Sequence, residues 1–330
     1  YHDSTRMGNP RAGRRLRGKT RRMEFGPYLL LASLEGAVTA AVLALTAVGL
    51  SLVFGVMRVV NVAHGEFFML GAVLAWWIAT TVGGHPALGF AVALVVAPLL
   101  VGALAALADM TVLKRVDYDP ERTIVATIGL LYIIQQVTLM TYGPEARPVE
   151  PPFNHRLAIP WIEKVEGSWQ FYYPWGLSTT SYKLAVIGAA VVVLLGVWAL
   201  LSRTKIGLVM RATQLDRDMA TAFGIPVERV YALVFGLGAA LAALGAVLVV
   251  PIQQAHYLMG GDPLLLSFIV VIIGGLGSLP GTVAAAVLIG LSDGIISVFF
   301  SPTLAKIIAT LLVALVLVFR PQGLFGTRAA

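Results

Sequence analysis

The sequence has no cysteine and few charged residues. Of its 330 residues none is Cys, and 12% are Asp, Glu, Lys or Arg. The absence of thiols excludes disulfides, zinc–thiolate centres and cysteine catalysis from this chain. A soluble domain carries about 25% charged residues, so this chain has too few to cover a water-facing surface. Apolar residues make up 58%, which indicates a protein that resides mainly in a lipid bilayer.

Long apolar runs account for this composition. A helix needs about 20 apolar residues to cross a hydrocarbon core of about 30 Å. Glycine and alanine are frequent within the runs, which allows helices to pack closely in lipid. We therefore predict an all-α fold, a polytopic transmembrane helical bundle of about 8–10 membrane segments. The runs lie at 28–56, 64–82, 86–110, 123–142, 182–201, 230–252, 264–279, 282–300 and 303–319.

Residues 1–22 differ from the remaining chain, because Arg and Lys alternate there with Gly, Ser and Asn. This composition predicts a basic disordered tail or an extension, which favours anionic lipid when it lies beside a membrane. The membrane domain is expected over 23–330. A formal match to the phosphate-binding loop runs from Gly13 to Thr20. We reject it, because the match neither follows a buried strand nor opens a helix.

The distribution of Lys and Arg predicts the orientation, because basic short loops tend to stay in the cytoplasm. The loops 113–122 and 202–229 are basic and are predicted to be cytoplasmic. The segment 143–181 is rich in Pro, Trp and Tyr, its acids match its bases, and we predict that it forms a periplasmic loop. Counting spans from the loop 202–229 places the C-terminus in the cytoplasm as well.

The first span does not fit this scheme. Arg58 and the basic tail both look cytoplasmic, although one helix cannot begin and end on the same side. Either the chain is outside at Met23 and the tail is not native, or residues 28–60 form a broken hairpin. We favour the first alternative.

Polar residues stand at the start of the second apolar run, at Asn61, His64 and Glu66. Such residues are costly in lipid, so they should face protein, a water-filled path or the interface. In one interpretation Asn61 and His64 cap a helix that begins near Gly65, and Glu66 complements its positive end. In the other they line the path of a substrate, and the two roles can coexist.

The fourth apolar run contains Thr127, Gln135 and Gln136. These side chains either bind a zwitterionic substrate or form hydrogen bonds with a neighbouring helix. We favour helix packing and keep the three residues as candidates for the path.

The basic loop 202–229 contains an amphipathic pattern. Apolar residues recur at three- and four-residue steps, which predicts one helix with an apolar face. Gly224 ends this helix and Pro226 prevents its continuation. Such a helix lies on the bilayer or docks into a groove of a partner. The apolar positions are Leu208, Ala212, Leu215, Met219, Ala222 and Phe223.

A cluster of glycines separates two apolar runs near the C-terminus. It contains Gly274, Gly275, Gly277 and Gly281. Glycines end helices and permit tight turns, so a turn between two spans is the favoured interpretation. The alternative is a helix break that lines the transport path.

These patterns resemble signatures of the branched-chain amino acid permease family of ABC importers. The pattern in the loop 202–229 is similar to the cytoplasmic coupling loop of that family. Three further patterns are similar to other family signatures, and all four together extend over nearly the whole chain from Met23. They are Gly207-x-x-x-Arg211-Ala212-x-x-x-Asp216-x-x-x-Ala220-x-x-x-Gly224-Ile225, Asn61-x-Ala63-His64-Gly65-Glu66, Gly274-Gly275-x-Gly277-Ser278-x-x-Gly281 and Phe319-Arg320-Pro321-Gln322-Gly323-Leu324.

The resemblance is closest to the first of two permease partners, although urea and short-amide permeases share most of these signatures. It implies import of branched-chain or related small amino acids across a bacterial or archaeal cytoplasmic (inner) membrane. The partners would be a homologous second permease, two ABC ATPases, a periplasmic or extracellular substrate-binding protein and membrane lipid, but no nucleic acid. This chain would hold no cofactor, since the ATPases would bind ATP and Mg.

The resemblance also implies that Arg211 and Asp216 orient the coupling helix or pair across the interface with an ATPase. A solvated ion pair within the helix is the simpler alternative. A urea or short-chain amide permease is the main alternative function.

Other function classes find less support. An intramembrane enzyme would have to use His64 with Glu66 or Asp293. The sequence contains no His-Glu-x-x-His zinc motif, no nucleophilic serine in a recognisable turn and no paired intramembrane aspartates. We therefore expect no catalytic residue and no metal site. A passive channel would not need the amphipathic helix of the loop 202–229, so this loop discriminates between a channel and a driven permease.

Overall fold

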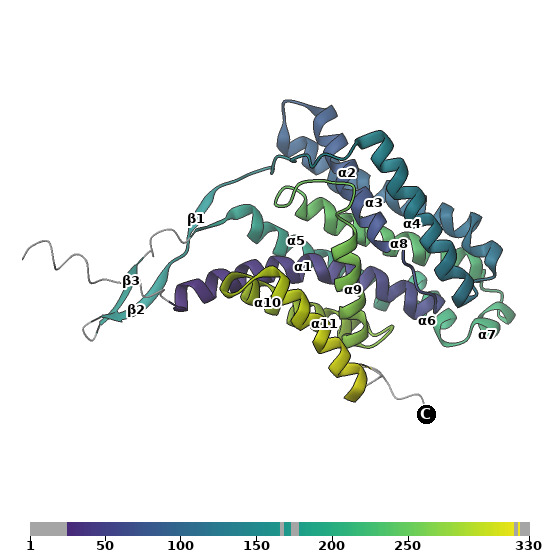
Figure 1. Cartoon of the computed structure of the whole chain (residues 1–330). Coiled ribbons are helices and arrows are strands. Elements are labelled where there is room, and N and C mark those ends of the chain that lie inside the picture. Colours follow the sequence, from purple (N-terminus) through teal and green to yellow (C-terminus); the bar gives the residue numbers. More distant parts are fainter. Residues whose placement is uncertain (1–24, 166–167, 173–177, 320–322, 324–330) are drawn as a thin grey trace, which may run out of the picture.

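The structure, a computed structural model, describes residues 25–165, 168–172, 178–319 and 323 (Figure 1). The predictions for the tail 1–22 and for most of the pattern 319–324 lie outside these residues. The helices are α1 (Phe25–Met57), α2 (His64–Val82), α3 (Pro86–Thr111), the short 3-10 helix η1 (Leu113–Val116), α4 (Pro120–Tyr142), α5 (Ser181–Arg203), α6 (Lys205–Leu215), α7 (Arg217–Ala222), α8 (Val227–Val249), α9 (Gly261–Gly274), α10 (Leu279–Phe299) and α11 (Pro302–Phe319).

Among the described residues, seven helices are long and apolar enough to cross a membrane. They are α1, α2, α3 with η1, α4, α5, α8 and α10. The helices α9 and α11 are apolar but shorter. Together these helices correspond to the apolar runs of the sequence, which confirms the prediction of a polytopic helical bundle.

Helix α1 forms the centre of the bundle. It spans 33 residues, or about 50 Å at 1.5 Å per residue, and it packs most extensively against α10 and α8. The contact with α8 is made by Gly49 and Gly238: a Cβ atom on Gly49 would lie 2.4 Å from the carbonyl oxygen of Gly238. Small residues thus let the two backbones touch. Because α1 is continuous, the alternative of a broken hairpin over residues 28–60 is wrong.

One end of the bundle is basic. Helix α1 ends beside α6, where an Nη atom of Arg58 lies 3.5 Å from the carbonyl oxygen of Gln214. The two basic loops meet at the same end, since Lys114 forms a 2.6 Å ion pair with Glu228. We call this the basic end, and it is the end that the sequence predicts to be cytoplasmic. The first turn of α1 lies at the opposite end (Figure 1).

Short strands project from the opposite end (Figure 1). The strands β1 (Arg156–Ala158) and β4 (Ser178–Thr180) form one antiparallel pair, and β2 (Trp161–Val165) and β3 (Ser168–Tyr172) form another. These strands within the segment 143–181 were not predicted from the sequence, because β1 and β4 have only three residues each and β2 and β3 only five.

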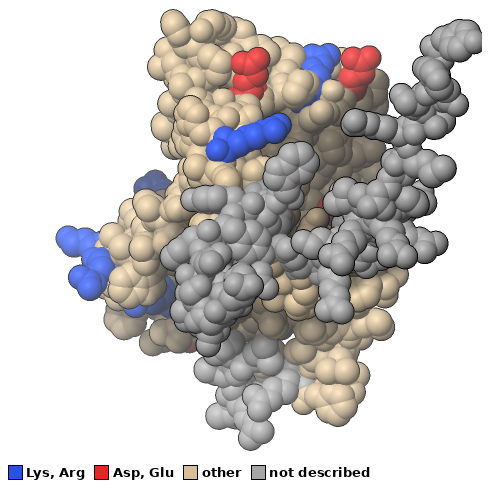
Figure 2. Space-filling view, turned by 90° about the vertical axis from the view of Figure 1, so that its left-hand side faces the viewer, with Lys and Arg blue, Asp and Glu red and all other residues tan. Residues whose placement is uncertain are grey.

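The described residues that are visible from the strand end include few charged side chains (Figure 2). In that view the coloured Lys, Arg, Asp and Glu side chains gather in the upper part and at the left edge of the molecule (Figure 2).

Candidate functional site

The basic end carries two short helices where the sequence predicted one. The pattern from Leu208 to Phe223 is interrupted at Asp216, which ends α6 and begins α7. The Asp216 carboxylate accepts hydrogen bonds from the backbone N–H groups of Asp218 and Met219, each at 3.0 Å. The prediction of a single helix is therefore wrong, because the side chain of Asp216 caps a new helix N-terminus.

Several glycine and alanine positions of the coupling-loop pattern shape this segment rather than point outward. A Cβ atom on Gly207 would lie 2.2 Å from the carbonyl oxygen of Leu201, so only glycine permits the sharp turn between α5 and α6. Ala220 is buried and Ala212 is half-buried. Gly224 has a φ of +80°, a left-handed conformation that ends α7.

Arg211 does not pair with Asp216 in the described part of the chain. Its Nε atom instead donates to the carbonyl oxygen of Gly207 at 3.3 Å, one turn earlier in α6. The alternative of an ion pair within the helix is not realised among the described residues, because the capping bonds direct the Asp216 carboxylate toward the backbone of α7.

Five large apolar side chains of this segment are exposed, namely Ile206, Leu208, Leu215, Met219 and Phe223. Leu215, Met219 and Phe223 have exposed fractions of 82%, 54% and 80%. Leu215, Met219 and Phe223 extend from the last residue of α6 to the residue after α7, and we call these three the α6–α7 face. Apolar groups exposed together mark a contact with lipid or with another protein.

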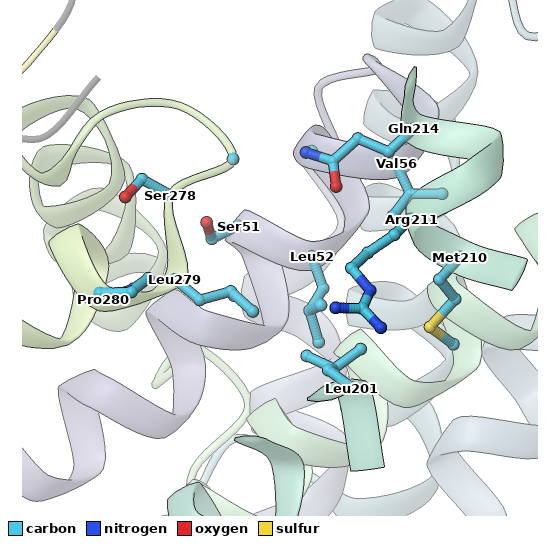
Figure 3. Close-up of a pocket in the computed structure, with 12 residues that line it drawn as sticks. Ser51, Leu52, Val56, Leu201, Met210, Arg211, Gln214, Ser278, Leu279 and Pro280 are labelled. Atoms are coloured by element: carbon cyan, nitrogen blue, oxygen red, sulfur yellow. The ribbon is translucent and has the colours of Figure 1, made fainter. Parts of the chain in front are cut away.

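A cavity of about 220 Å³ lies between helix α6 and the core of the bundle. We call it the Arg211 cavity, and it lies between α1, α6 and the turn that joins α9 to α10 (Figure 3). The guanidinium group of Arg211 points toward Leu52 and Leu201, and Gln214 extends from α6 toward α1 (Figure 3). The further lining residues include Ser51, Gly55, Gly277 and Ser278.

The glycine cluster forms this turn. Gly274 is the last residue of α9, Gly275 and Gly277 have φ values of +98° and +80°, and Gly281 lies in the first turn of α10. A Cβ atom on Gly277 would lie 3.1 Å from the Cα atom of Gly55 at the end of α1. The turn is thus in contact with both α1 and α6, so two patterns that are distant in the sequence meet here.

Helix α7 is held against the bundle by aromatic residues that the sequence analysis did not single out. The guanidinium carbon of Arg217 lies 5.7 Å and 5.6 Å from the ring centres of Tyr118 and Tyr231, within the range of a cation–π contact. The hydroxyl of Tyr118 donates to Asp109 at 3.3 Å. Burial raises the pKa of Tyr118, so this donor keeps its proton at neutral pH.

The second candidate region is the start of α2. Asn61, His64 and Glu66 have exposed fractions of 1%, 1% and 4%. The Asn61 carbonyl accepts from the N–H of Ala63 at 3.1 Å, and the His64 Nε2 atom bonds the carbonyl oxygen of Thr46 in α1 at 2.9 Å. The N-cap residue is Ala63 and has no side-chain cap, so the prediction that Asn61 and His64 cap this helix is wrong.

The start of α2 contains polar atoms without a partner among the described residues. They are Nδ2 of Asn61, Nδ1 of His64 and Oε2 of Glu66. Next to them, Gly65 and Gly260 touch through their backbones, because a Cβ atom on either would lie within 2.4 Å of a carbonyl oxygen of the other. Buried polar groups normally have partners, so this region has hydrogen-bonding capacity that the chain alone does not use.

The candidates in α4 separate into two groups. Thr127 is fully buried and its hydroxyl accepts from the N–H of Val62 at 3.3 Å, so it supports the start of α2. Gln135 is half-buried and Gln136 is exposed. Thr127 therefore contacts the start of α2, whereas the side chain of Gln136 is exposed.

No group of three or more His, Asp and Glu side chains is placed to hold a metal ion in the part of the chain that the structure describes.

Comparison with known proteins gives one family and several relatives. The family described as "Branched-chain amino acid transport system / permease component" matches residues 32–317. The high-affinity branched-chain amino acid transport system permease protein LivH of Escherichia coli is 26% identical over 308 residues, which cover 91% of this chain and 96% of the relative. The permease protein BraD of Pseudomonas aeruginosa is 27% identical over 303 residues, or 88% and 94%. No solved structure matches the chain.

An archaeal relative is similar to the same extent. The probable branched-chain amino acid transport permease protein LivH of Methanocaldococcus jannaschii is 27% identical over 308 residues, which cover 89% of this chain and 91% of the relative.

Proposed function

The chain belongs to the branched-chain amino acid transport permease family of ABC transporters, and from this premise we propose that it is the membrane subunit of an ATP-driven importer. It moves branched-chain or related small amino acids inward across the cytoplasmic membrane of a bacterium or archaeon. The names of the bacterial and archaeal relatives support this substrate class. The C-terminus faces the cytoplasm in this proposal.

The chain works with other subunits. It pairs with a homologous second permease, receives substrate from a binding protein outside, and is driven by two ABC ATPases. ATP and Mg are bound by those ATPases and not by this chain. The chain itself is a transport component and not an enzyme, as its family and relatives indicate.

The observation that carries the proposal is the exposed α6–α7 face at the basic end. Leu215, Met219 and Phe223 leave apolar surface uncovered on a segment that carries the coupling-loop pattern. Covering such side chains with a partner stabilises a complex by about 1.5–3 kcal/mol per fully buried large residue. We assign this face to the ATPase.

The contacts of α6 and α7 provide a route for the movement. Arg217 holds α7 against Tyr118, which lies between η1 and α4, and against Tyr231 in α8. Helix α6 lies against the end of α1 and the α9–α10 turn. A rigid-body shift of the α6–α7 segment therefore reaches several helices at once. Different contacts with the ATPase in two nucleotide states then bias the bundle between two forms.

The interior of the bundle suits alternating access. Among the cavities along α1, one extends from Ser51 toward the basic end and one reaches Thr46 from the opposite end. Between them Ala47, Val48 and Leu50 are at most 2% exposed. This buried band separates the two cavities, so a substrate crosses only when the helices move.

Co-purification tests the proposal. The chain in detergent is expected to retain an ATPase subunit, and the double variant Leu215→Ala with Phe223→Ala is expected to weaken that complex at least about tenfold, which corresponds to about 1.4 kcal/mol. Both side chains are exposed, so the variant should remain folded.

The matched control is Val192→Ala with Leu195→Ala, which removes similar apolar groups from the exposed side of α5. This control should retain the ATPase. Loss of the ATPase in the control alone, or its retention by the α6–α7 variant, would refute the assigned face. Failure of the unaltered chain to bind any ATPase would favour a passive channel.

A further inference from the structure

A second cavity lies at the end of the bundle opposite to α6. It has a volume of about 330 Å³ and is formed by α1, α2, the α8–α9 connection, α9, α10 and α11. We call it the Asp293 cavity. Its volume lies at the small end of the range of about 300–1,000 Å³ for pockets that hold a small molecule. It is therefore large enough for one free amino acid.

One part of the lining is apolar. Val42 and Leu43 of α1, Phe68 of α2 and Leu266 of α9 contribute aliphatic and aromatic groups. Such a surface favours a hydrocarbon side chain, because burial of apolar surface is favourable by about 25 cal/mol per Å². Urea and short amides would leave this surface unused.

The other part of the lining is charged and has more acids than bases. Two of its acids have a lysine partner: Glu35 pairs with Lys183 at 2.5 Å, and Asp262 pairs with Lys306 at 2.6 Å. Asp293 of α10 is half-buried and has no ion-pair partner among the described residues. The cavity therefore contains one carboxylate whose charge is not neutralised by direct contact.

Asp293 is energetically costly at its position if it only supports the fold. It lies in the apolar helix α10, where an uncompensated charge is expensive and marks a functional site or a partner. Lys306 on α11 lines the same cavity, but its ammonium group already contacts Asp262. A cation that enters the cavity would give Asp293 the partner that it lacks.

We propose that the Asp293 cavity binds the free amino acid as a zwitterion, with Asp293 receiving the α-ammonium group and the apolar lining receiving the side chain. Lys306 binds the carboxylate, because an ammonium group has three donors and the pair with Asp262 uses one. This assignment rests on the proposed function, since it names the site at which the imported amino acid is held.

The lining of the cavity includes two residues next to the start of α2. Thr46 lines the cavity, and the carbonyl oxygen of the same residue bonds His64. Phe68, one turn after His64, also belongs to the lining. Through Thr46 and Phe68, the buried polar residues at the start of α2 thus adjoin the lining of the site.

Direct binding of radiolabelled leucine to the purified full-length chain in lipid nanodiscs tests the assignment. Asp293→Asn removes the charge at nearly constant shape and should weaken leucine binding roughly ten- to a hundredfold, because it removes a charged hydrogen bond. Asp293→Glu should restore most of the binding. Glu150→Gln, which neutralises an exposed acid on the outer segment, should leave binding unchanged.

A competitor tests the role of the ammonium group. 4-Methylpentanoate has the carboxylate and side chain of leucine but no ammonium group, so it should compete poorly for the unaltered chain. If Asp293→Asn does not fold, Leu266→Phe reduces the apolar space instead and should weaken leucine binding more than alanine binding.

Leucine uptake by cells that express the whole transporter distinguishes an error in the assigned site from an error in the proposed function. Suppose that the unaltered transporter takes up leucine, and that the unaltered chain and Asp293→Asn bind leucine equally well. This result would overturn the assigned site and leave the proposed function intact. Absence of leucine binding by the unaltered chain would also overturn the site. Absence of any uptake by the unaltered transporter would overturn the proposed function itself.

Discussion

Replacing Gly49 by alanine tests whether α1 and α8 pack through their backbones. A Cβ atom on Gly49 would lie 2.4 Å from the carbonyl oxygen of Gly238, whereas ordinary contacts begin at 3.4 Å. The two helices would have to move apart by about 1 Å, and overpacking of this kind costs about 1–3 kcal/mol. Backbone atoms cannot rotate away as a flexible side chain could, so we expect a clear loss of stability.

Gly188→Ala is the matched control, since nothing lies within 4 Å of a Cβ atom at Gly188 in α5. Both substitutions gain about 1 kcal/mol of helix propensity, and this gain cancels in the comparison. Gly49→Ala should therefore be less stable than Gly188→Ala by about 1–3 kcal/mol, or on the order of a few degrees in melting temperature. Thermal unfolding in detergent, followed by size-exclusion chromatography, measures this difference. Equal melting temperatures would refute the close contact of α1 with α8.

Two further substitutions test local contacts. Asp216→Ala removes the cap of α7, and such a cap typically contributes about 1 kcal/mol. Hydrogen exchange of the first α7 amides should therefore accelerate in Asp216→Ala, whereas Asp216→Asn should retain slow exchange. Equal exchange rates in the two variants would contradict the capping role. Tyr142→Phe removes the 2.8 Å hydrogen bond from the Tyr142 hydroxyl to the carbonyl oxygen of Ala255 and should cost about 0.5–1.5 kcal/mol of unfolding free energy. An unchanged melting temperature of Tyr142→Phe would show that this bond contributes nothing to stability.

The sequence was sufficient to predict the membrane bundle, because length and hydrophobicity of each run determine whether a helix spans a bilayer. The break at Asp216 was missed because apolar periodicity continues across it. A stronger weight on the capping preference of Asp would have indicated the break, since Asp is favoured at helix N-termini and not in helix interiors. The continuous α1 was also not decided by sequence, because Arg58 and the basic tail gave contradictory signals.

The contacts between distant segments could not be predicted from one sequence. Asp293 and Phe68 lie far apart in the chain and line the same cavity only because of how α10 and α2 are placed in the bundle. The role of Thr46 was equally hidden, since its carbonyl oxygen and not its side chain binds His64. Patterns of residue types describe each helix by itself, whereas a site depends on how helices pack.

ATP-driven uptake tests the central claim most directly, namely that separate ATPases drive this chain through the α6–α7 face. The complete transporter, with its binding protein outside and nucleotide inside, would be reconstituted in lipid vesicles and supplied with radiolabelled leucine. We predict accumulation with ATP but not with ADP, and loss of accumulation in the variant Leu215→Ala with Phe223→Ala. Equal uptake with ADP, or full uptake by this variant, would contradict the account.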